Sequence, residues 1–511
     1  MQGDPCAPAL VGRSVLMRRV VLLLGRWTDI VPREMRAELV RRAIVPALGD
    51  RDVLVRLAAA DALALAIAHH DLPAAEVADL VAPMCQQLLA LIAGVSELDL
   101  NCHLLKCLKG VIERLESHIR PAAALIAQAL PALWERGSGV DDLDQQTLMR
   151  QSVIRIMSTL VGALGADSVG LHALAMPVLH YCLNSDEDGE AGNIKDSFLE
   201  EALDLWSQVV ANAPALTPEL EALFAHWFPL AAFNTSLIGP LMSVLRSYAL
   251  FNTSAFMERH AARINRLVAD LLADSTDNSV PHLMPAVEVL FTLYPAQAPA
   301  AFGDITQTLV KELLASQSAV AAERTQLSER SLALYVRAVC RMCVVNLPAM
   351  ARIWQAFAQQ AQRDAVPVLL EAVFAHLDCV REVYHQKTVA LALAQFVAAP
   401  SELRPEHLPA FATRILDVVN STLTELFSDR AATRVPQFSA ADFPADAAQW
   451  TEGHRVQRMI MQDAVTAVDL KAFVLQKLGE CQQTLGAERF AQVMASIDPF
   501  VLEQLQAAPS Q

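Results

Sequence analysis

The chain has 511 residues and a formal net charge of −16, from 40 basic and 56 acidic side chains. This acidic balance argues against a nucleic-acid-binding protein, whose phosphate affinity needs a basic surface, and it permits a basic protein partner. Hydrophobic residues make up 54% of the chain, but the apolar runs are shorter than the roughly 18 residues of a membrane-spanning helix. Since Arg13, Arg18 and Arg19 interrupt the first of these runs, we expect neither a membrane span nor a signal peptide.

The first clear element is the segment GDRDVLVRLAAADAL, from Gly49 to Leu63. Asp52 stands where a helix N-cap is wanted, because its side chain can accept a bond from a free N–H of the first turn. We expect Arg56 to reach back to Asp52 or across to the loop of the next unit. Small or branched apolar residues then recur on one helix face, where they allow a neighbouring helix to come close: Val55, Ala59, Ala62 and Ala66. This pattern is typical of the second helix of a HEAT repeat, a two-helix unit of about 40 residues.

Similar units recur along the chain. Prolines mark apolar helices at intervals of 37 to 52 residues, at Pro46, Pro83, Pro131, Pro177 and Pro229. Second helices are predicted between them, for example at Leu100–Ser117 and Gln146–Leu164. Further apolar helical segments follow at Leu237–Leu250, Ala261–Ala273, Pro285–Leu293, Ile305–Leu314, Ser331–Val345, Pro367–Leu377 and Lys387–Val397. With few glycines and tyrosines beside abundant alanine and leucine, the sequence predicts an all-α superhelix, an α-solenoid of HEAT-type helix pairs, over residues 1–427.

The last part of the chain has a different character. Residues 428–463 lack a consistent period and are predicted to be a loop or linker. After them, Leu470, Val474 and Cys481 lie on one helical stripe, and Val493 and Ile497 lie on another. Residues 464–511 are therefore predicted to be helices that cap the end of the array, because terminal repeats are usually atypical.

Few residues suggest chemistry. Cys340 and Cys343 form a CxxC pair, but they lie within a continuous helical stripe and without a second ligand pair, so we interpret them as buried structural thiols. His69 and His70 end a predicted helix, where a histidine interacts favourably with the helix dipole. The nine scattered cysteines do not suggest a disulfide framework, which fits a reducing compartment. Because the sequence lacks phosphate-binding, nucleophile-elbow, zinc-protease and dinucleotide motifs, we expect a protein that is not an enzyme and holds no cofactor or metal.

One loop is a candidate contact for a partner. The stretch NSDEDGEAG carries Asp186, Glu187, Asp188 and Glu190. It lacks the longer alternating ligand series and closing glutamate of a calcium loop. Two interpretations stay open: a solvated connection, or an anionic patch that contacts a basic partner.

The tryptophans divide into two groups. Five lie within helical stripes and are expected in the core: Trp27, Trp134, Trp206, Trp227 and Trp354. Trp450 lies in the predicted linker and is a candidate exposed anchor.

Several segments resemble one protein family. MRRVVLLLGRW (Met17–Trp27), VIERLESHIRP (Val111–Pro121), EEALDLWSQVVANAPALTPEL (Glu200–Leu220) and the terminal stretch Asp469–Leu505 are similar in order and wording to the importin-β (karyopherin-β) family, in its importin-eleven-like branch. The resemblance covers nearly the whole chain, more faintly between residues 290 and 440. It identifies a lineage better than it identifies sites, because these segments are structural.

The resemblance implies an α-solenoid that carries protein cargo through the nuclear pore and releases it to Ran in its GTP form. It implies slots between outer helices for phenylalanines of pore proteins, and shuttling between nucleus, nuclear envelope and cytoplasm. Members of the family carry their principal Ran-binding repeats nearer the N-terminus, so this chain is expected to correspond to the C-terminal half. A second hypothesis is a HEAT scaffold for a protein complex, without a transport role.

Overall fold

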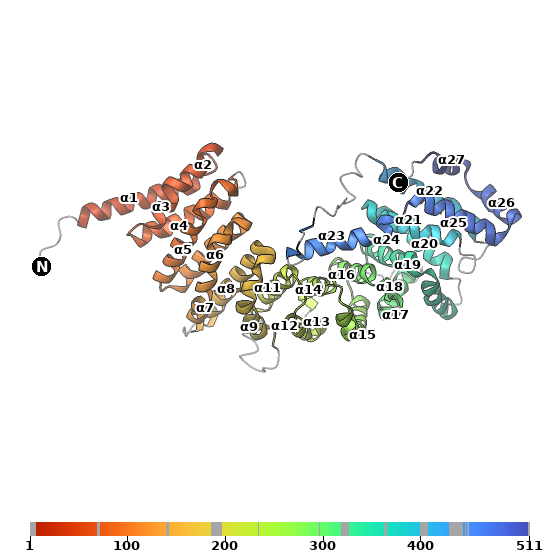
Figure 1. The fold of residues 1–511 in the computed structure, drawn as a ribbon, viewed down its shortest axis with the longest axis horizontal. Coiled ribbons are helices and arrows are strands. Elements are labelled where there is room, and N and C mark those ends of the chain that lie inside the picture. Colours follow the sequence, from red (N-terminus) through yellow and green to blue (C-terminus); the bar gives the residue numbers. More distant parts are fainter. Residues whose placement is uncertain are drawn as a thin grey trace. The chain divides into compact units, whose positions relative to one another are not determined.

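The computed structural model describes residues 7–68, 72–138, 143–184, 197–233, 235–295, 297–317, 327–361, 365–398, 407–428, 443–444, 446 and 449–508. Every regular element within these ranges is helical, which confirms the all-α prediction (Figure 1). The chain divides into two compact units. Unit 1 comprises Met1–His226 with Asp446–Thr451, and unit 2 comprises Trp227–Ala445 with Glu452–Gln511.

Unit 1 is a stack of helix pairs. Its helices are α1 (Ala7–Arg26), α2 (Arg33–Leu39), α3 (Val45–Leu48), α4 (Val53–Ala68), α5 (Val81–Gly94), α6 (Leu98–Leu115), α7 (Arg120–Ser138), α8 (Leu143–Leu164), α9 (His172–Leu183), α11 (Leu199–Asn212) and α12 (Pro218–Leu223). The second helix of each pair packs on the second helix of the next, in the order α4, α6, α8 and α11. The first helices α3, α5 and α7 form the other row, so each hairpin buries its apolar faces against its neighbours.

Unit 2 repeats this arrangement. Its helices are α13 (Trp227–Phe233), α14 (Ile238–Ala249), α15 (Ser254–Ala273), α16 (Val280–Leu293), α17 (Ala298–Ala301), α18 (Gly303–Ser316), α19 (Glu329–Ala361), α20 (Ala365–Ala375), α21 (Val383–Val397), α22 (Leu408–Leu426), α23 (Glu452–Gln462), α24 (Ala464–Ala467), α25 (Leu470–Leu485), α26 (Ala487–Ser496) and α27 (Pro499–Ala507). The second-helix row runs α14, α16, α19 and α21, while α15, α18 and α20 form the first-helix row. Helix α25 packs on α21, and α26 and α27 pack on α22.

Helix α4 shows why the predicted repeat unit folds as it does. The Leu54 N–H donates to Asp52 Oδ1 at 2.8 Å, which confirms the N-cap. The predicted stripe is fully buried along the helix, at Val55, Ala59, Ala62 and Ala66. The prediction for Arg56 was wrong: its Nε donates to the carbonyl oxygen of Leu48 at 3.0 Å, because the end of α3 lies within the same hairpin and offers an unpaired carbonyl.

Close approach of α1 and α4 depends on small residues. A Cβ added at Gly25 of α1 would lie 2.6 Å from the Cα of Ala62. The two helices therefore touch backbone to backbone at this point, as the alanine face of α4 predicts. By contrast, a Cβ added at Gly110, inside α6, would meet nothing within 4 Å.

The Gly25→Ala variant is expected to lower the stability of unit 1 by about 1–3 kcal/mol, the usual cost of overpacking against a rigid backbone. Gly110→Ala, the matched control, should raise stability by about 0.5–1 kcal/mol, because alanine loses less backbone entropy in a helix. Thermal unfolding followed by circular dichroism measures both shifts. Equal shifts of the same sign would contradict the close packing of α1 on α4.

Two features of the fold differ from the sequence predictions. Residues 452–462, within the predicted linker, form helix α23, because Val456, Met459 and Ile460 make one apolar face on a short, mostly polar helix. Residues 429–442 of that linker lie outside the described residues, and the division into 1–427, 428–463 and 464–511 stays a prediction.

Trp27 is 50% exposed and not a core residue, since it follows the last turn of α1, whereas Trp206, Trp227 and Trp354 are fully buried.

Two helical stretches are long and apolar enough to cross a membrane by length and composition: Asp144–Leu183 and Glu329–Phe357. The first is interrupted, because Gly165 has φ +57° and a 3₁₀ segment separates α8 from α9. The second is interrupted within α19, where Asn346 has non-helical angles. Such stretches are weak indicators of a membrane span, since core helices of a solenoid pass the same test.

The CxxC pair lies on α19, and both thiols are buried, as predicted. Burial raises the pKa of Cys340 from its ordinary 9.0 to about 12 and raises the pKa of Cys343 well above the same value. A thiolate is the form that reacts or binds metal, and the raised pKa values keep both thiols protonated near neutral pH.

These thiols predict a loss of stability in alkali. Above about pH 9 the unfolded chain has released thiol protons that the folded chain still holds, so stability falls as pH rises, by about 1.4 kcal/mol per pH unit for each such thiol. We expect the melting temperature of Cys340→Ala/Cys343→Ala to depend less on pH than that of the wild type between about pH 9 and 11. Parallel pH profiles for the two proteins would contradict this expectation.

Candidate binding surfaces of the two units

A polar groove lies on the second-helix row of unit 1, between α6, α8 and α11, with a volume of about 580 Å³. We call it the acidic groove, because its carboxylates outnumber its cations: it is lined by Glu113, Glu116, Glu201 and Asp204 against Lys109 and Arg155. Lys109 pairs with Glu113 along α6, and Arg155 of α8 pairs with Glu201 of α11. Two carboxylates therefore remain in excess.

Two carboxylates of the acidic groove lack full compensation by hydrogen-bond donors or positive charges. Glu201 is only 6% exposed, and its Oε2 atom has no hydrogen-bond partner within the described part of the chain. Burial, together with the nearby charge of Glu200, raises the pKa of Asp204 above its ordinary value. A buried acceptor without a donor costs free energy, so an incoming cationic donor would gain by filling this position.

The opposite row of unit 1 carries an apolar slot of about 330 Å³ between α7 and α9, with α8 below it. We call it the aromatic slot. Trp134 of α7 and Tyr181 of α9 meet edge to face, with ring centroids 5.9 Å apart. The guanidinium of Arg150 lies over the Trp134 ring at 5.0 Å, a cation–π contact that fixes the indole. Leu130, Leu174 and Pro177 complete the apolar lining. Trp134 thus lines a surface slot and is only partly in the core.

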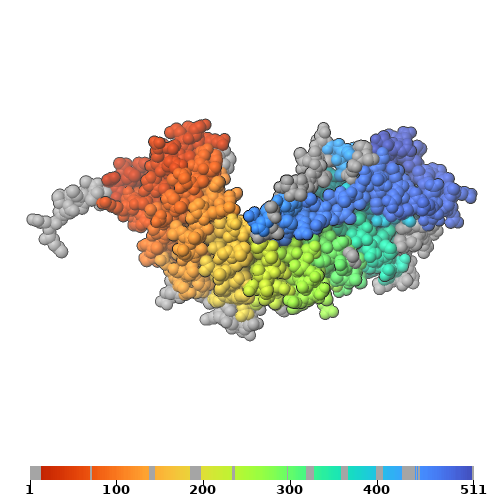
Figure 2. Space-filling model, viewed as in Figure 1, coloured from red at the N-terminus to blue at the C-terminus, as the bar shows by residue number. Residues whose placement is uncertain are grey.

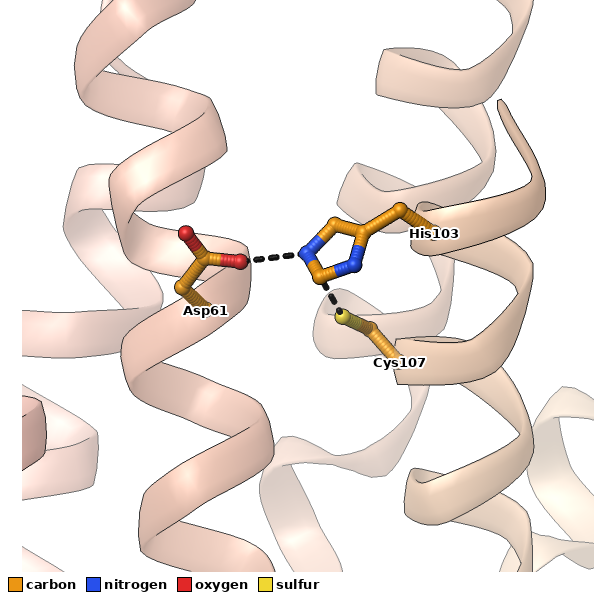
Figure 3. A group of neighbouring side chains, drawn as sticks. All are labelled: Asp61, His103 and Cys107. Carbon is orange, nitrogen blue, oxygen red and sulfur yellow. Dashed lines mark hydrogen bonds and ion pairs between the residues drawn. The ribbon is translucent and has the colours of Figure 1, made fainter. Parts of the chain in front are cut away.

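A carboxylate, an imidazole and a thiol meet between α4 and α6 (Figure 3). Asp61 of α4 pairs with His103 Nε2 of α6, and Cys107 Sγ lies 3.9 Å from the same nitrogen. These are side chains that zinc accepts, but a structural zinc site takes four, and this cluster offers three within the described residues. Burial also raises the pKa of Cys107 to about 11, which keeps it a protonated thiol. The contact between Asp61 and His103, which joins neighbouring second helices, accounts for the arrangement.

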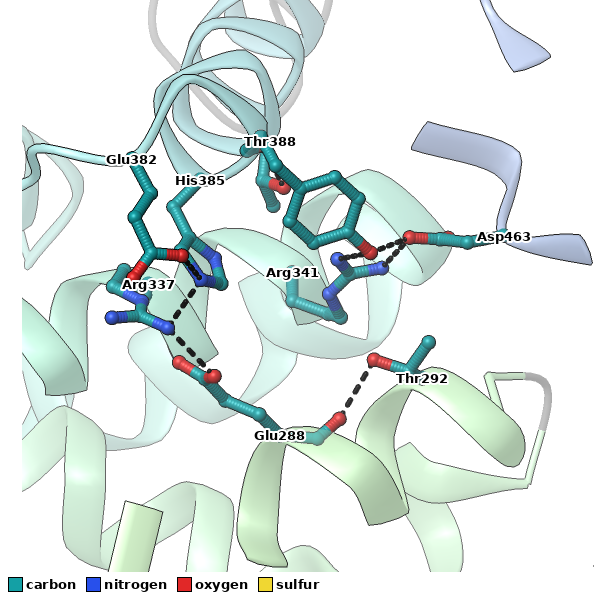
Figure 4. A network of polar contacts seen from close by, with 9 residues as sticks. Glu288, Thr292, Arg337, Arg341, Glu382, His385, Thr388 and Asp463 are labelled. Carbon is teal, nitrogen blue, oxygen red and sulfur yellow. Dashed lines mark hydrogen bonds and ion pairs between the residues drawn. The ribbon is translucent and has the colours of Figure 1, made fainter. Parts of the chain in front are cut away.

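The second-helix row of unit 2 carries a network of charged residues (Figure 4). Arg337 of α19 donates to Glu288 Oε2 of α16 at 2.8 Å and also contacts His385 of α21. The side-chain hydrogen bond from His385 and the nearby Arg337 charge hold the pKa of Glu382 below its ordinary value. One turn further along α19, Arg341 pairs with Asp463 Oδ2 at 2.7 Å.

The acidic loop of Asp186, Glu187, Asp188 and Glu190 lies outside the described residues, as do His69 and His70. The interpretation of this loop as a partner contact stays a prediction. Trp450 is half-buried and belongs to a segment that clusters with unit 1.

The acidic groove was not predicted from the sequence. A signal was available, because residues one repeat apart meet on this row: Asp61 pairs with His103, and Arg155 with Glu201, at separations of 42 and 46 residues. Charged residues on neighbouring second helices that are separated by about this distance in the sequence could therefore have been paired, and such pairs lie at the groove.

The sequence is similar to a family model and to several known proteins. A family model described as importin-11-like, with TPR repeats, matches residues 151–510. Importin-11 of Mus musculus is 23% identical over 498 residues, which cover 96% of this chain and 49% of the mouse protein. The importin beta-like protein kap113 of Schizosaccharomyces pombe is 21% identical over 96% of this chain and 48% of its own length. The chain thus spans about half the length of the curated relatives it matches.

Solved structures show the same fold. Lph2, described as a bidirectional nuclear transport receptor of S. cerevisiae, superposes with a TM-score of 0.72 at 17% identity, over 97% of this chain and 52% of Lph2. Kap95p, in a structure that describes its binding to RanGDP, superposes with a TM-score of 0.54 at 12% identity, over 96% of this chain and 55% of Kap95p. Kap95 in complex with Nup1 gives a TM-score of 0.50 at 11% identity, over 89% of this chain and 52% of Kap95.

These relatives are named as importins or transport receptors and not as enzymes, in agreement with the expectation of a non-catalytic protein. The helical hairpins, their stacking in rows and the fold of Lph2 agree with one architecture, the importin-type α-solenoid. Since the family model matches more than half of the residues, the chain belongs to the importin-11-like family of importin-β proteins.

Proposed function

We propose that this chain is part of a nuclear transport receptor that binds a basic protein cargo in the acidic groove of unit 1. The observation that carries the proposal is the excess of carboxylates in the lining of the groove, where Glu113, Glu116, Glu201 and Asp204 face only Lys109 and Arg155. A lysine or arginine of the cargo would pair with the carboxylates in excess and would stabilise the charged form of Asp204, whose pKa is raised by burial and by the nearby Glu200. The net charge of −16 adds long-range attraction for such a cargo.

The family relationship supports the other parts of the proposal. Kap95p is described as binding RanGDP, and Kap95 as forming a complex with Nup1. By analogy, the whole receptor would release its cargo to Ran in the nucleus and shuttle through the nuclear envelope between nucleus and cytoplasm. The aromatic slot, with Trp134 and Tyr181 at its rim, suits a phenylalanine side chain of a pore protein.

The acidic groove can be tested with charge reversal. Glu113→Lys/Asp204→Lys should weaken binding of a fluorescein-labelled lysine- and arginine-rich peptide by about tenfold or more, which corresponds to about 1.4 kcal/mol. Wild-type binding should itself weaken as salt rises, because exposed charges are screened. Fluorescence anisotropy at graded salt measures both effects.

Glu38→Lys is the matched control, since Glu38 is an exposed carboxylate on α2, a first-helix element. Its affinity for the basic peptide should stay within about twofold of the wild type. A glutamate-rich peptide that binds as well as the basic one, without dependence on salt, would refute the cargo proposal and favour a scaffold role.

The aromatic slot can be tested by filling it. Ala173 is an exposed residue of the slot lining, so Ala173→Trp should occupy the slot without disturbing the core. We expect it to weaken binding of a phenylalanine–glycine repeat peptide by about tenfold, because burial of a phenyl ring is worth about 1.5–3 kcal/mol. Broadening of the peptide's aromatic proton resonances reports binding. Ala124→Trp, exposed on α7 outside the slot lining, is the control, and equal effects of the two variants would exclude the slot.

A further inference from the structure

Residues 452–468 follow an unusual path for a solenoid. They comprise α23 and α24 and form a strap that crosses the second-helix row of unit 2, from α14 to α21. Figure 2 shows the blue of this part of the chain lying along the green helices of unit 2. In the rest of this row, helices follow one another in chain order. The strap instead packs on helices that precede it by about 200 residues in the sequence. Arg246 and Glu452, which contact each other, are 206 residues apart.

A carboxylate fastens the first end of the strap. Glu452 Oε1 accepts from Arg246 of α14, at 3.0 Å from Nε and 2.8 Å from Nη2. Its second oxygen, Oε2, accepts from the hydroxyl of Ser247. The Glu452 side chain is 13% exposed, so this is a largely desolvated anchor.

A second carboxylate fastens the other end. Asp463 accepts from Arg341 at 2.7 Å and from the hydroxyl of Tyr384, and the side chains of Arg341 and Asp463 are 6% and 7% exposed. Asp463 also caps α24 by accepting from the Val465 N–H at 3.2 Å. Lys387 of α21 donates to the carbonyl of Thr466 at 3.4 Å, which adds a second cation to this end.

Between the two anchors the strap is loosely packed. Arg455 is the one residue of α23 that is buried. A cavity of about 270 Å³ remains between the strap and the helices below, bounded by Met459 and Ile460 on one side and Arg337 on the other. The strap is therefore held by charges at its ends more than by an apolar core between them.

We propose that the second-helix row of unit 2 is a docking site for an amphipathic helix of a partner protein that carries a carboxylate near each end, and that the strap occupies this site until the partner displaces it. The strap itself shows the chemistry that the site accepts: two carboxylates eleven residues apart, at Glu452 and Asp463, at the ends of a helix with one apolar face and with Arg455 and Arg458 between them. Without the strap, Arg246 and Arg341 lose their carboxylate partners, so the site attracts anionic side chains. This preference is opposite in sign to that of the acidic groove, and the proposal does not depend on the transport function.

The test uses the full 511-residue chain and a fluorescein-labelled peptide of residues 452–468 as the probe. The Glu452→Lys/Asp463→Lys variant should release its own strap, because both anchors become repulsive. We expect it to bind the peptide at least tenfold more tightly than the wild type, whose strap competes for the site. A peptide with Glu452→Gln and Asp463→Asn should bind the variant at least tenfold more weakly than the natural peptide.

Glu371→Lys is the matched control, since Glu371 pairs with Arg414 at an exposed position of the same unit and should leave peptide binding at the wild-type level. If charge reversal abolishes the thermal transition, the milder variant Glu452→Gln/Asp463→Asn takes its place. Equal binding of the peptide to wild type and variant, or binding to neither folded protein, overturns the proposal. Loss of the transition in both variants overturns it too, because the strap would then be an integral part of the fold.

Discussion

A helical hairpin of this chain cannot bury its apolar faces alone, and the rest of the structure depends on that constraint. Each hairpin must pack on the one before and the one after, so contacts join residues about one repeat apart. Polar links follow the same rule. Arg155 meets Glu201, Arg337 meets Glu288 and Arg414 meets Glu371, at separations of 46, 49 and 43 residues. Such side-chain bridges fix the register between hairpins while the apolar seam supplies most of the stability.

Because the hairpins stack in two rows, the first helices form one surface and the second helices form another. In unit 1 the second-helix row gathers the carboxylates of the acidic groove, while the first-helix row leaves the aromatic slot between α7 and α9. In unit 2 the second-helix row gathers arginines instead, and the strap neutralises two of them. One repeating architecture thus carries differently charged side chains on the second-helix rows of its two units, because the fold constrains the buried faces of each hairpin and leaves the exposed faces free to vary.

The fold was largely predictable and the sites were not. The N-cap at Asp52 and the alanine face of α4 follow from local pattern, and both are present. The acidic loop at 186–190 stood out in the sequence because its charges are adjacent, but it lies outside the described residues. Glu113 and Asp204 were overlooked because they are 91 residues apart in the chain and meet only through two layers of helix packing. Helix α23 was overlooked although Val456, Met459 and Ile460 lie at helical spacing, because this short stripe stands within an otherwise aperiodic stretch.

Local sequence pattern was enough to predict that the chain is helical, that its helices come in pairs and which face of α4 is buried, because these properties depend on residues within about one or two turns of each other. Only the tertiary structure decided which charges share a surface, where Trp134 opens to solvent, and that residues 452–468 return to the row built by α14 to α21. These outcomes depend on the geometry of stacking and on partners far apart in the chain, which local periodicity does not encode.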